Sequence, residues 1–218
     1  MIVWEFFAGS RSFSKVAEER GHTTYTTDII GFDEIDQTCN IFDFDIEKAL
    51  EKTGKPDIIW FSPPCKYFSV ASCYHHWSKG DFGIFHPKSE GALLGLQLID
   101  RVQHLIEILR PKFYIIENPR GLMRKMPSMR GHVRDTVWYC QYGDNRAKPT
   151  DLWTNFGLSD PQICKNSNPN CHHERAQRST TQGTQGLKNN YDRSIVPPQL
   201  CHEILNQLEQ GISGGRFL

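Results

Sequence analysis

The sequence predicts an α/β domain built on a doubly wound, mostly parallel sheet. Three short apolar runs, residues 2–7, 57–61 and 113–116, have the continuous hydrophobicity of strands that are buried on both faces. Segments with apolar residues at helical spacing lie between these runs and after them. Strands that alternate with helices favour a parallel sheet with right-handed crossovers.

The first third of the chain supplies the first strand, a helix and a second strand. The strand over residues 2–7 is followed by a helix over residues 12–20. This helix is expected to end at Gly21, because glycine readily adopts the backbone conformation that closes a helix. A second strand over residues 25–27 ends at Asp28.

The middle of the chain supplies two further strands and a long helix between them. The strand over residues 57–61 runs into the segment "SPPC", and the strand over residues 113–116 runs into "ENPR". Ser89 can cap the helix between them, which is expected to end before Pro111. The apolar residues at helical spacing in this helix are Leu98, Ile99, Val102, Leu105, Ile106 and Leu109.

The last part of the chain divides into a polar segment and an amphipathic helix. Residues 154–193 are rich in asparagine, serine, threonine, glutamine and glycine, so this segment cannot build a core of its own. An amphipathic helix follows, and we expect it to pack back on the first part of the chain. The predicted organisation is therefore a main domain over residues 1–153, a small insertion over 154–193, and a C-terminal helix with a tail over 194–218.

The composition excludes several general classes of function. The 25 lysines and arginines balance the 25 aspartates and glutamates, so any attraction to nucleic acid must be local. No apolar run reaches the length of about 18 residues that a membrane span requires, and no signal-peptide pattern opens the chain. We therefore expect a cytoplasmic protein without a membrane partner. The seven cysteines are an odd number, which favours reduced thiols over a disulfide framework.

Ligands of open α/β sheets bind outside the carboxyl ends of the strands, so the residues at those ends are the candidate site. The first strand leads into "FAGSRSFSK", a turn of small residues before a helix, where a ligand can approach backbone N–H groups. The alternative is a plain tight turn. Asp28 stands where an acid commonly binds ribose hydroxyls, and its alternative is a turn or capping aspartate.

Cys65 follows two prolines at the end of a strand. The prolines fix the backbone and thereby aim the side chain. A free thiol has a pKa of about 8.5, so a nucleophilic role requires activation by a nearby positive charge, and Lys66 is the adjacent cation. The alternative is an inert cysteine that fills space as a small hydrophobic residue.

Glu117 closes the third apolar strand, and a stretch without acids follows it. A buried carboxyl needs either an ion-pair partner or a functional role, and burial favours its protonated, proton-donating form. Residues 119–134 contain five basic residues, which favours a polyanionic partner over a merely solvated loop. The basic residues are Arg120, Arg124, Lys125, Arg130 and Arg134.

These segments, in this order, resemble the motif series of the cytosine-5 DNA methyltransferases. The resemblance is carried by "FAGSRSFSKVAEERG", Asp28, "SPPCKYFS", "ENPRG" and "YGDNRAKPTDLWTN", and it extends over about residues 1–155 and, more faintly, the last helix. It is strongest to the short phage and prophage type with a reduced target-recognition region. It implies a Rossmann-like class I methyltransferase fold over residues 1–153.

The resemblance implies a covalent reaction on a flipped cytosine. Cys65 would add to carbon 6 of the ring while Glu117 acts as an acid at ring nitrogen 3. The activated carbon 5 would then take the methyl group of S-adenosyl-L-methionine, and a base would remove the carbon 5 proton. The cytosine must leave the duplex for this, and the loop after Cys65 is the natural element to close over it.

The resemblance also assigns roles to further residues. Arg146 and Lys148 would be the cations that stabilise substrate and loop. The expected cofactor-binding residues are Phe7, Ala8, Gly9, Ser10, Arg11, Ser12, Asp28, Ile29, Asn40, Ile41, Pro63 and Ser194. The expected substrate-binding residues are Pro64, Asn118, Pro119, Arg120, Arg124 and Lys125.

Several positions depart from the family pattern. Arg11 and Ser12 replace expected residues of the glycine-rich turn, and Asn40 stands where an acid is expected. Pro119 replaces a valine after the glutamate and asparagine, and Thr150 replaces the second arginine of the later motif. These changes leave open a modified methyl donor with an altered transferred group.

The insertion contains a candidate zinc site. "CKNSNPNCHH" brings Cys164, Cys171, His172 and His173 within reach of one another, and a zinc ion could hold together a segment that lacks a core. The alternative is chance clustering in a polar loop. Arg175, Arg178 and Lys188 are an alternative set of contacts to nucleic-acid phosphates.

DNA is the predicted partner, in the cytoplasm of a prokaryotic or phage-infected cell. The alternatives are an RNA cytosine-5 methyltransferase and an inactive nucleic-acid-binding protein that keeps the fold. The presence of both Cys65 and Glu117 opposes the inactive form, because a binding module needs neither. The sequence leaves open the recognition site, the strandedness of the substrate, a restriction endonuclease as partner, and the oligomeric state.

Overall fold

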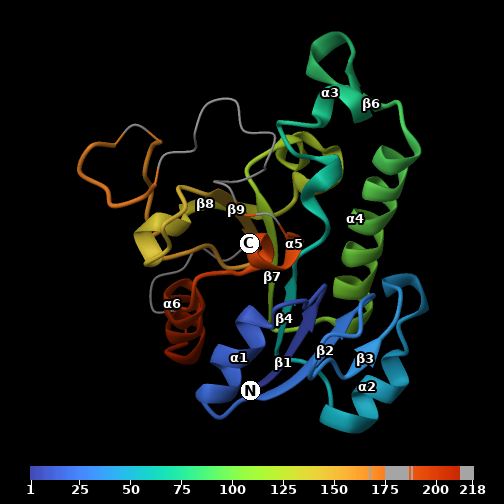
Figure 1. Cartoon of the computed structure of the whole chain (residues 1–218). Coiled ribbons are helices and arrows are strands. Elements are labelled where there is room, and N and C mark those ends of the chain that lie inside the picture. Colours follow the sequence, from blue (N-terminus) through green and yellow to red (C-terminus); the bar gives the residue numbers. More distant parts are fainter. Residues whose placement is uncertain (167, 175–186, 188, 212–218) are drawn as a thin grey trace.

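The structure, a computed structural model, describes residues 1–166, 168–174, 187 and 189–211. Its centre is a seven-stranded sheet with the order β3-β2-β1-β4-β7-β9-β8 (Figure 1). The first five strands in this order are parallel, β9 runs antiparallel to β7, and β8 is antiparallel to β9 and so runs in the direction of the first five. The predicted doubly wound, mostly parallel sheet is therefore confirmed. The strands are β1 (Ile2–Phe6), β2 (Thr23–Asp28), β3 (Gln37–Thr38), β4 (Ile58–Phe61), β7 (Phe113–Pro119), β8 (Val133–Trp138) and β9 (Pro149–Thr154).

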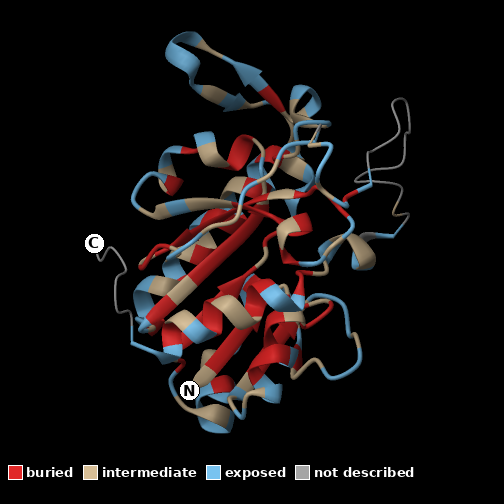
Figure 2. Cartoon of the chain, turned by 90° about the vertical axis from the view of Figure 1, so that its left-hand side faces the viewer, coloured by how far each residue is buried: buried red, intermediate tan, exposed pale blue. Residues whose placement is uncertain are grey.

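Helices cover both faces of the sheet (Figure 1). One face packs against α2 (Ile46–Thr53) and α4 (Glu90–Leu109), and the other packs against α1 (Ser12–Glu19) and α6 (Pro198–Glu209). Successive strand residues point to opposite faces, so Trp4 joins the α4 side and Val3 joins the α1 side. Because both faces are covered, the central strands β1 and β4 are buried and almost wholly apolar in sequence (Figure 2).

The ends of α4 follow from its sequence. The Ser89 hydroxyl accepts a hydrogen bond from the Ala92 backbone N–H at 3.1 Å, which caps the first turn as predicted. The helix ends at Arg110, whose backbone is left-handed with φ of 43°, directly before Pro111. Its buried residues lie on the side that faces the sheet.

The C-terminal helix packs where the sequence placed it. The buried α6 residues Leu200, Ile204, Leu205 and Leu208 lie in the same apolar cluster as Phe13 of α1. The division into a main domain, an insertion and a C-terminal helix stays a prediction. In the described part of the chain, no helix has the length and apolar character to cross a membrane.

The segment between Cys65 and α4 forms a separate projection. It contains α3 (Cys73–His76) and the hairpin of β5 (Trp77–Lys79) and β6 (Phe85–Pro87). The hairpin extends from the body at the top of Figures 1 and 2, and most of it is exposed. Phe82 at its tip is fully exposed and has a left-handed backbone with φ of 56°. The remaining short helices are α5 (Asn190–Ser194), η1 (Ile41–Asp43), η2 (Cys65–Tyr67), η3 (Asp81–Gly83), η4 (Leu122–Lys125), η5 (Pro127–Met129) and η6 (Tyr139–Tyr142).

Candidate active site

The turn after β1 is held against the end of β2. Phe7, Gly9 and Arg11 all have positive φ, at 56°, 40° and 53°, which makes the turn tight. One carboxylate oxygen of Asp28, Oδ2, accepts a hydrogen bond from the Gly9 N–H at 2.9 Å, and Oδ1 accepts one from the Ile30 N–H at 2.9 Å. Each oxygen keeps further lone-pair capacity, so Asp28 can still accept hydroxyl donors from a ligand.

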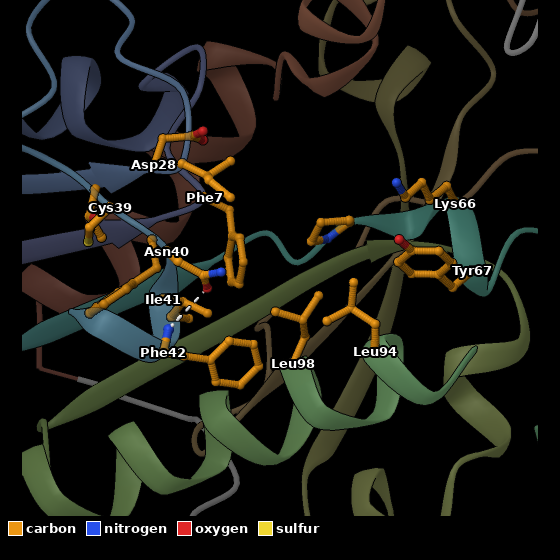
Figure 3. A pocket seen from close by; sticks show the side chains of 14 residues that line it. Phe7, Asp28, Cys39, Asn40, Ile41, Phe42, Lys66, Tyr67, Leu94 and Leu98 are labelled. Carbon is orange, nitrogen blue, oxygen red and sulfur yellow. Dashed lines mark hydrogen bonds between the residues drawn. The ribbon is translucent and has the colours of Figure 1, made fainter. Parts of the chain in front are cut away.

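A cavity of about 230 Å³ opens beside this turn (Figure 3). Phe7 and Asp28 lie at one side of it, Lys66 and Tyr67 at the other, and Leu98 of α4 along its floor. Its walls are mostly apolar with a carboxylate on one side, which fits a nucleoside whose base packs on apolar side chains and whose ribose meets Asp28. The lining residues are Phe6, Phe7, Thr27, Asp28, Ile29, Cys39, Asn40, Ile41, Phe42, Pro64, Lys66, Tyr67, Leu94 and Leu98.

The cavity takes in some of the predicted cofactor residues and leaves others outside its lining. Those that line it are Phe7, Asp28, Ile29, Asn40 and Ile41, together with Pro64, which the sequence assigned to substrate. Those outside the lining are Ala8, Gly9, Ser10, Arg11, Ser12, Pro63 and Ser194. Tyr67 and Leu94 are lining residues that the sequence reasoning missed. Tyr67 could have been found from the sequence because it lies two residues after Cys65. Leu94 could not, because its place in the cavity depends on how α4 packs.

Two side chains of the turn bind other parts of the protein. The Arg11 guanidinium is only 7% exposed and forms ion pairs with Glu18 and Glu34. The Ser12 hydroxyl accepts a hydrogen bond from the Val196 N–H at 3.1 Å, which ties the turn to the segment before α6. The predicted direct contact of the Arg11 side chain with a cofactor is therefore corrected to a structural role.

Asn118 links the two motifs that carry Cys65 and Glu117. Its Nδ2 donates a hydrogen bond to the Pro63 carbonyl at 2.8 Å, across the adjacent ends of β4 and β7. The side chain is 1% exposed, so it positions the loop rather than presenting its amide to solvent. This bond ties the loop before Cys65 to the end of β7, and a substrate contact of Asn118, whose Oδ1 has no hydrogen-bond partner in the described part of the chain, stays a prediction.

Glu117 lies in a buried polar cluster with Tyr139 and Lys148. The Tyr139 hydroxyl donates to Glu117 Oε1 at 3.0 Å, and Lys148 Nζ lies 3.8 Å from the same oxygen. Lys148 Nζ also donates to the Arg193 carbonyl at 3.0 Å. Burial lowers the pKa of Lys148, and the negative charge of Glu117 opposes this change. Since both contacts fall on Oε1, the other carboxylate oxygen is the one that can meet a ligand.

Cys65 begins the 3₁₀ turn η2 directly after Pro64, and the residue is exposed. The protein around its thiol nevertheless raises the pKa, chiefly by withdrawing water from the sulfur. The Lys148 charge opposes the rise and the Glu117 charge adds to it. The resting thiol is therefore protonated near neutral pH, and it needs Lys148 and the arriving substrate to become a nucleophile.

The N–H groups of the Arg146 guanidinium donate hydrogen bonds to other groups of the protein. It is 7% exposed, forms an ion pair with Asp144, and donates to the carbonyls of Asp192 at 3.0 Å and Ile195 at 3.0 Å. Of the two predicted cations, Lys148 therefore lies beside Glu117, whereas the contacts of Arg146 hold the segment before α6 against the loop that carries Lys148.

Of the five basic residues in the stretch after β7, Arg124 is partly buried and the other four are exposed. Arg124 is paired with Asp151, which is fully buried on β9, and Arg124 Nε lies 2.9 Å from Asp151 Oδ2. The predicted phosphate contact of Arg124 is therefore corrected to a structural ion pair. Arg120 lies over the Trp138 ring at 5.4 Å, and Pro119 pairs with Thr150 in the sheet. The exposed members are Arg120, Lys125, Arg130 and Arg134.

Replacing Arg124 by alanine is expected to destabilise the protein by about 3 kcal/mol, because the substitution leaves the buried Asp151 carboxylate without its counter-charge. Arg124 is partly exposed, so the loss should be at the lower end of the range for buried pairs. The neighbouring exposed Lys125, changed to alanine, should alter stability by less than about 0.5 kcal/mol. Urea unfolding of both variants measures the difference, and equal stabilities would rule out the ion pair as a structural element.

The predicted metal ligands come together only in part. Cys164, Cys171 and His173 form a cluster with Cys140, and their ligand atoms all lie within 4.8 Å of one another. His172 is outside this cluster, because its Nε2 lies 3.1 Å from the Asp144 carbonyl. The prediction of His172 as a ligand is therefore wrong, and Cys140 takes its place. The alternative phosphate-binding residues Arg175, Arg178 and Lys188 lie outside the described residues.

Comparison with known proteins identifies a viral relative and a number of distantly similar solved structures. No family model matches the chain. A protein of Frog virus 3 (isolate Goorha), named a probable DNA (cytosine-5)-methyltransferase, is 31% identical over 219 residues, covering 94% of this chain and 99% of its own. A mutant of Spodoptera frugiperda DNMT2 is 14% identical over 75% of this chain, with a TM-score of 0.41. The S. pombe Dnmt2 methyltransferase is 12% identical over 71% of this chain, with a TM-score of 0.43. The chain spans about half the length of these two structures, 53% and 48% respectively.

Proposed function

The chain belongs to the family of cytosine-5 methyltransferases, and from this premise we propose that it transfers a methyl group from S-adenosyl-L-methionine to carbon 5 of cytosine in DNA. The observation that carries the proposal is the placement of Cys65 and Glu117 at the ends of the adjacent strands β4 and β7. The hydrogen bond from Asn118 to Pro63 joins the two strand ends. The proposed nucleophile and the proposed acid therefore lie at neighbouring strand ends.

The cavity beside the first turn is proposed to hold the cofactor. Asp28 would accept the ribose hydroxyls, and Phe7 and Ile41 would pack against the adenine. Asn40 donates no charge where an acid is usual, and its carbonyl oxygen already accepts from the Phe42 N–H at 3.2 Å. Adenine is therefore proposed to be held chiefly by apolar contact. When bound, the cofactor supplies an electrophilic methyl group.

Cys65, Glu117 and Lys148 are proposed to prepare the cytosine. The Cys65 thiol gives its proton to solvent, and its sulfur bonds to carbon 6 as the electron pair of the 5,6 double bond moves onto carbon 5. After carbon 5 takes the methyl group, a base removes its proton and the thiolate leaves carbon 6. Glu117, through the oxygen that does not contact Tyr139, gives a proton to ring nitrogen 3 and thereby eases the addition. The Lys148 charge favours the Cys65 thiolate, and Lys148 Nζ also lies 3.8 Å from Glu117 Oε1.

The projection after Cys65 is proposed to cover the flipped base. It belongs to the same segment as the nucleophile, and it exposes the large apolar side chains of Val70, Tyr74, Phe82 and Ile84. Apolar side chains of this kind can replace the stacking that a flipped base leaves behind. The exposed basic residues Arg120, Lys125, Arg130 and Arg134 would contact phosphates.

Asp28→Ala is expected to weaken binding of S-adenosyl-L-methionine by roughly ten- to hundredfold, which corresponds to the loss of hydrogen bonds to a charged acceptor. Asp28→Asn keeps one acceptor oxygen for the Gly9 N–H and should fall between the alanine variant and the wild type. Asp33→Ala, an exposed acid in the following loop, is the matched control. Isothermal titration calorimetry measures all four proteins, and equal affinities would place the ribose elsewhere.

The proposed reaction is tested by methyl transfer from labelled S-adenosyl-L-methionine to mixed-sequence DNA and to RNA of the same sequence. The expected result is label in DNA, recovered as 5-methylcytosine. Label in RNA alone would overturn DNA as the substrate while keeping the reaction. Absence of label in both would overturn the reaction and leave only the fold.

A further inference from the structure

We propose that Cys140, Cys164, Cys171 and His173 bind a single structural zinc ion that fastens the insertion to the main domain. The four ligand atoms come from two parts of the chain, since Cys140 lies in η6 and the other three lie in the insertion. All four fall within 4.8 Å of one another, and Cys164 Sγ lies 3.9 Å from His173 Nδ1. Sulfur ligands about 2.3 Å from a tetrahedral zinc are about 3.8 Å apart, so a small inward adjustment completes the site.

The imidazole of His173 is oriented for metal binding. Its Nε2 lies 3.2 Å from the Asn166 carbonyl, which can only accept, so Nε2 carries the proton. The other nitrogen, Nδ1, then has its lone pair free and faces Cys164 Sγ. A zinc-bound histidine characteristically donates its second N–H to a carbonyl, which fixes the tautomer and the ring orientation.

The cysteine sulfurs have the hydrogen-bond donors that thiolate ligands require. Asn168 Nδ2 donates to Cys164 Sγ at 3.5 Å, and Gln141 Nε2 donates to Cys171 Sγ at 3.4 Å. N–H donors directed at sulfur stabilise the thiolate over the thiol. Three thiolates and one imidazole form a closed, four-coordinate set of the type that zinc takes in structural sites, with no position left for a substrate.

The burial of His173 is otherwise hard to explain. Among the described residues from 159 to 174, His173 is the single one that is buried, and this stretch offers no apolar core for it. Its metal-binding neighbours Cys140, Cys164 and Cys171 belong to a small apolar cluster with Trp138 and Ala147. The His173 ring lies among three free thiols and has few apolar residues around it. Coordination of a metal, rather than apolar packing, therefore accounts for its burial.

The ion would support the loop next to the proposed active site. Directly beside the ligands, the Glu174 N–H donates to the Asn145 carbonyl at 2.9 Å, and His172 contacts the Asp144 carbonyl. That loop continues through Arg146 to Lys148, which lies 3.8 Å from Glu117. Zinc is thus expected to stabilise the position of Lys148 without touching substrate, and its binding is independent of the proposed reaction.

The two adjacent histidines provide a matched pair for the test. Wild type and variants are expressed with zinc, dialysed without chelator, and assayed for metal by mass spectrometry. We expect about one zinc per chain in wild type, His172→Ala and Cys73→Ser, and a content lower by about fivefold or more in His173→Ala and Cys140→Ser. Zinc absent from wild type, retained in His173→Ala, or lost equally from His172→Ala would overturn the proposal.

A second measurement uses the wild-type chain, so it tests the site even if the variants fail to fold. Cobalt(II) is exchanged into wild-type protein, and the absorption spectrum is recorded. Tetrahedral coordination by thiolates predicts intense sulfur-to-cobalt charge-transfer bands together with the visible bands of a four-coordinate ion. A spectrum of octahedral cobalt without charge-transfer bands would contradict the site, and so would a disulfide between two of the three cysteines in protein purified under reducing conditions.

Discussion

Replacing Cys65 by serine is expected to reduce methyl transfer by about 10⁴-fold or more while leaving the fold intact. The serine hydroxyl ionises far less readily than a thiol and is a weaker nucleophile, so the addition to carbon 6 fails. Structural damage should be small because Cys65 is exposed and serine is close to cysteine in size. The initial rate of label transfer at saturating DNA and cofactor measures the effect.

Cys73→Ser is the control for the Cys65 experiment. Cys73 lies in the same projection, on α3, and its thiol only donates to the Val70 carbonyl at 3.4 Å. The Cys73 variant should transfer methyl groups at a rate close to that of wild type. A Cys65→Ser rate within about tenfold of wild type, with unchanged cofactor affinity, would remove this thiol from the chemistry.

Glu117→Gln is expected to lower the rate of transfer by roughly 10²- to 10⁴-fold, because glutamine cannot give a proton to ring nitrogen 3. Glutamine has nearly the shape of glutamate and still offers an oxygen to the Tyr139 hydroxyl. The variant should therefore bind cofactor normally and fail in the chemical step. Single-turnover rates together with calorimetric cofactor affinity separate these two properties.

The same substitution has a second consequence at Lys148. The negative charge of Glu117 raises the pKa of this lysine against the effect of burial, so removing the charge lowers that pKa further. Keeping Lys148 protonated then costs the folded state more than the unfolded chain, so the variant should be destabilised near neutral pH and regain stability relative to wild type as the pH rises. Tyr139→Phe, which keeps the carboxylate and removes one hydrogen bond, should cost only about 1 kcal/mol. A Glu117→Gln enzyme as fast as wild type would exclude the proposed acid.

Much of the sheet could be predicted from the sequence, because its central strands are buried on both faces. β1, β4 and the first part of β7 are therefore mostly apolar in sequence, and the positions of Cys65 and Glu117 near the ends of β4 and β7 follow directly. β8 and β9 were missed because their sequences, "VRDTVW" and "PTDLWT", mix charged residues and proline with apolar ones. Charged strand residues are stable there only through partners such as Arg124, which belong to another part of the chain.

The details of the site depend on contacts between distant segments. Arg124 was assigned to phosphate because a count of basic residues cannot show that a buried aspartate on β9 will fold against it. Cys140 was missed as a metal ligand because only the packing of the insertion on η6 brings it to Cys164. Tyr139 likewise gave no signal of its own, since its hydroxyl meets Glu117 only once β8 and β7 share a sheet.

The most direct test of the proposed chemistry is covalent trapping on DNA that carries 5-fluorocytosine. Fluorine at carbon 5 cannot leave as a proton does, so the bond between the sulfur and carbon 6 persists after transfer. Wild-type protein with S-adenosyl-L-methionine should form a complex that survives denaturation, and mass spectrometry of its peptides should find the nucleotide on Cys65. The DNA is chosen so that the same sequence with ordinary cytosine is methylated. If its 5-fluorocytosine form gives no adduct, or if the adduct forms on a cysteine other than Cys65, the account is contradicted.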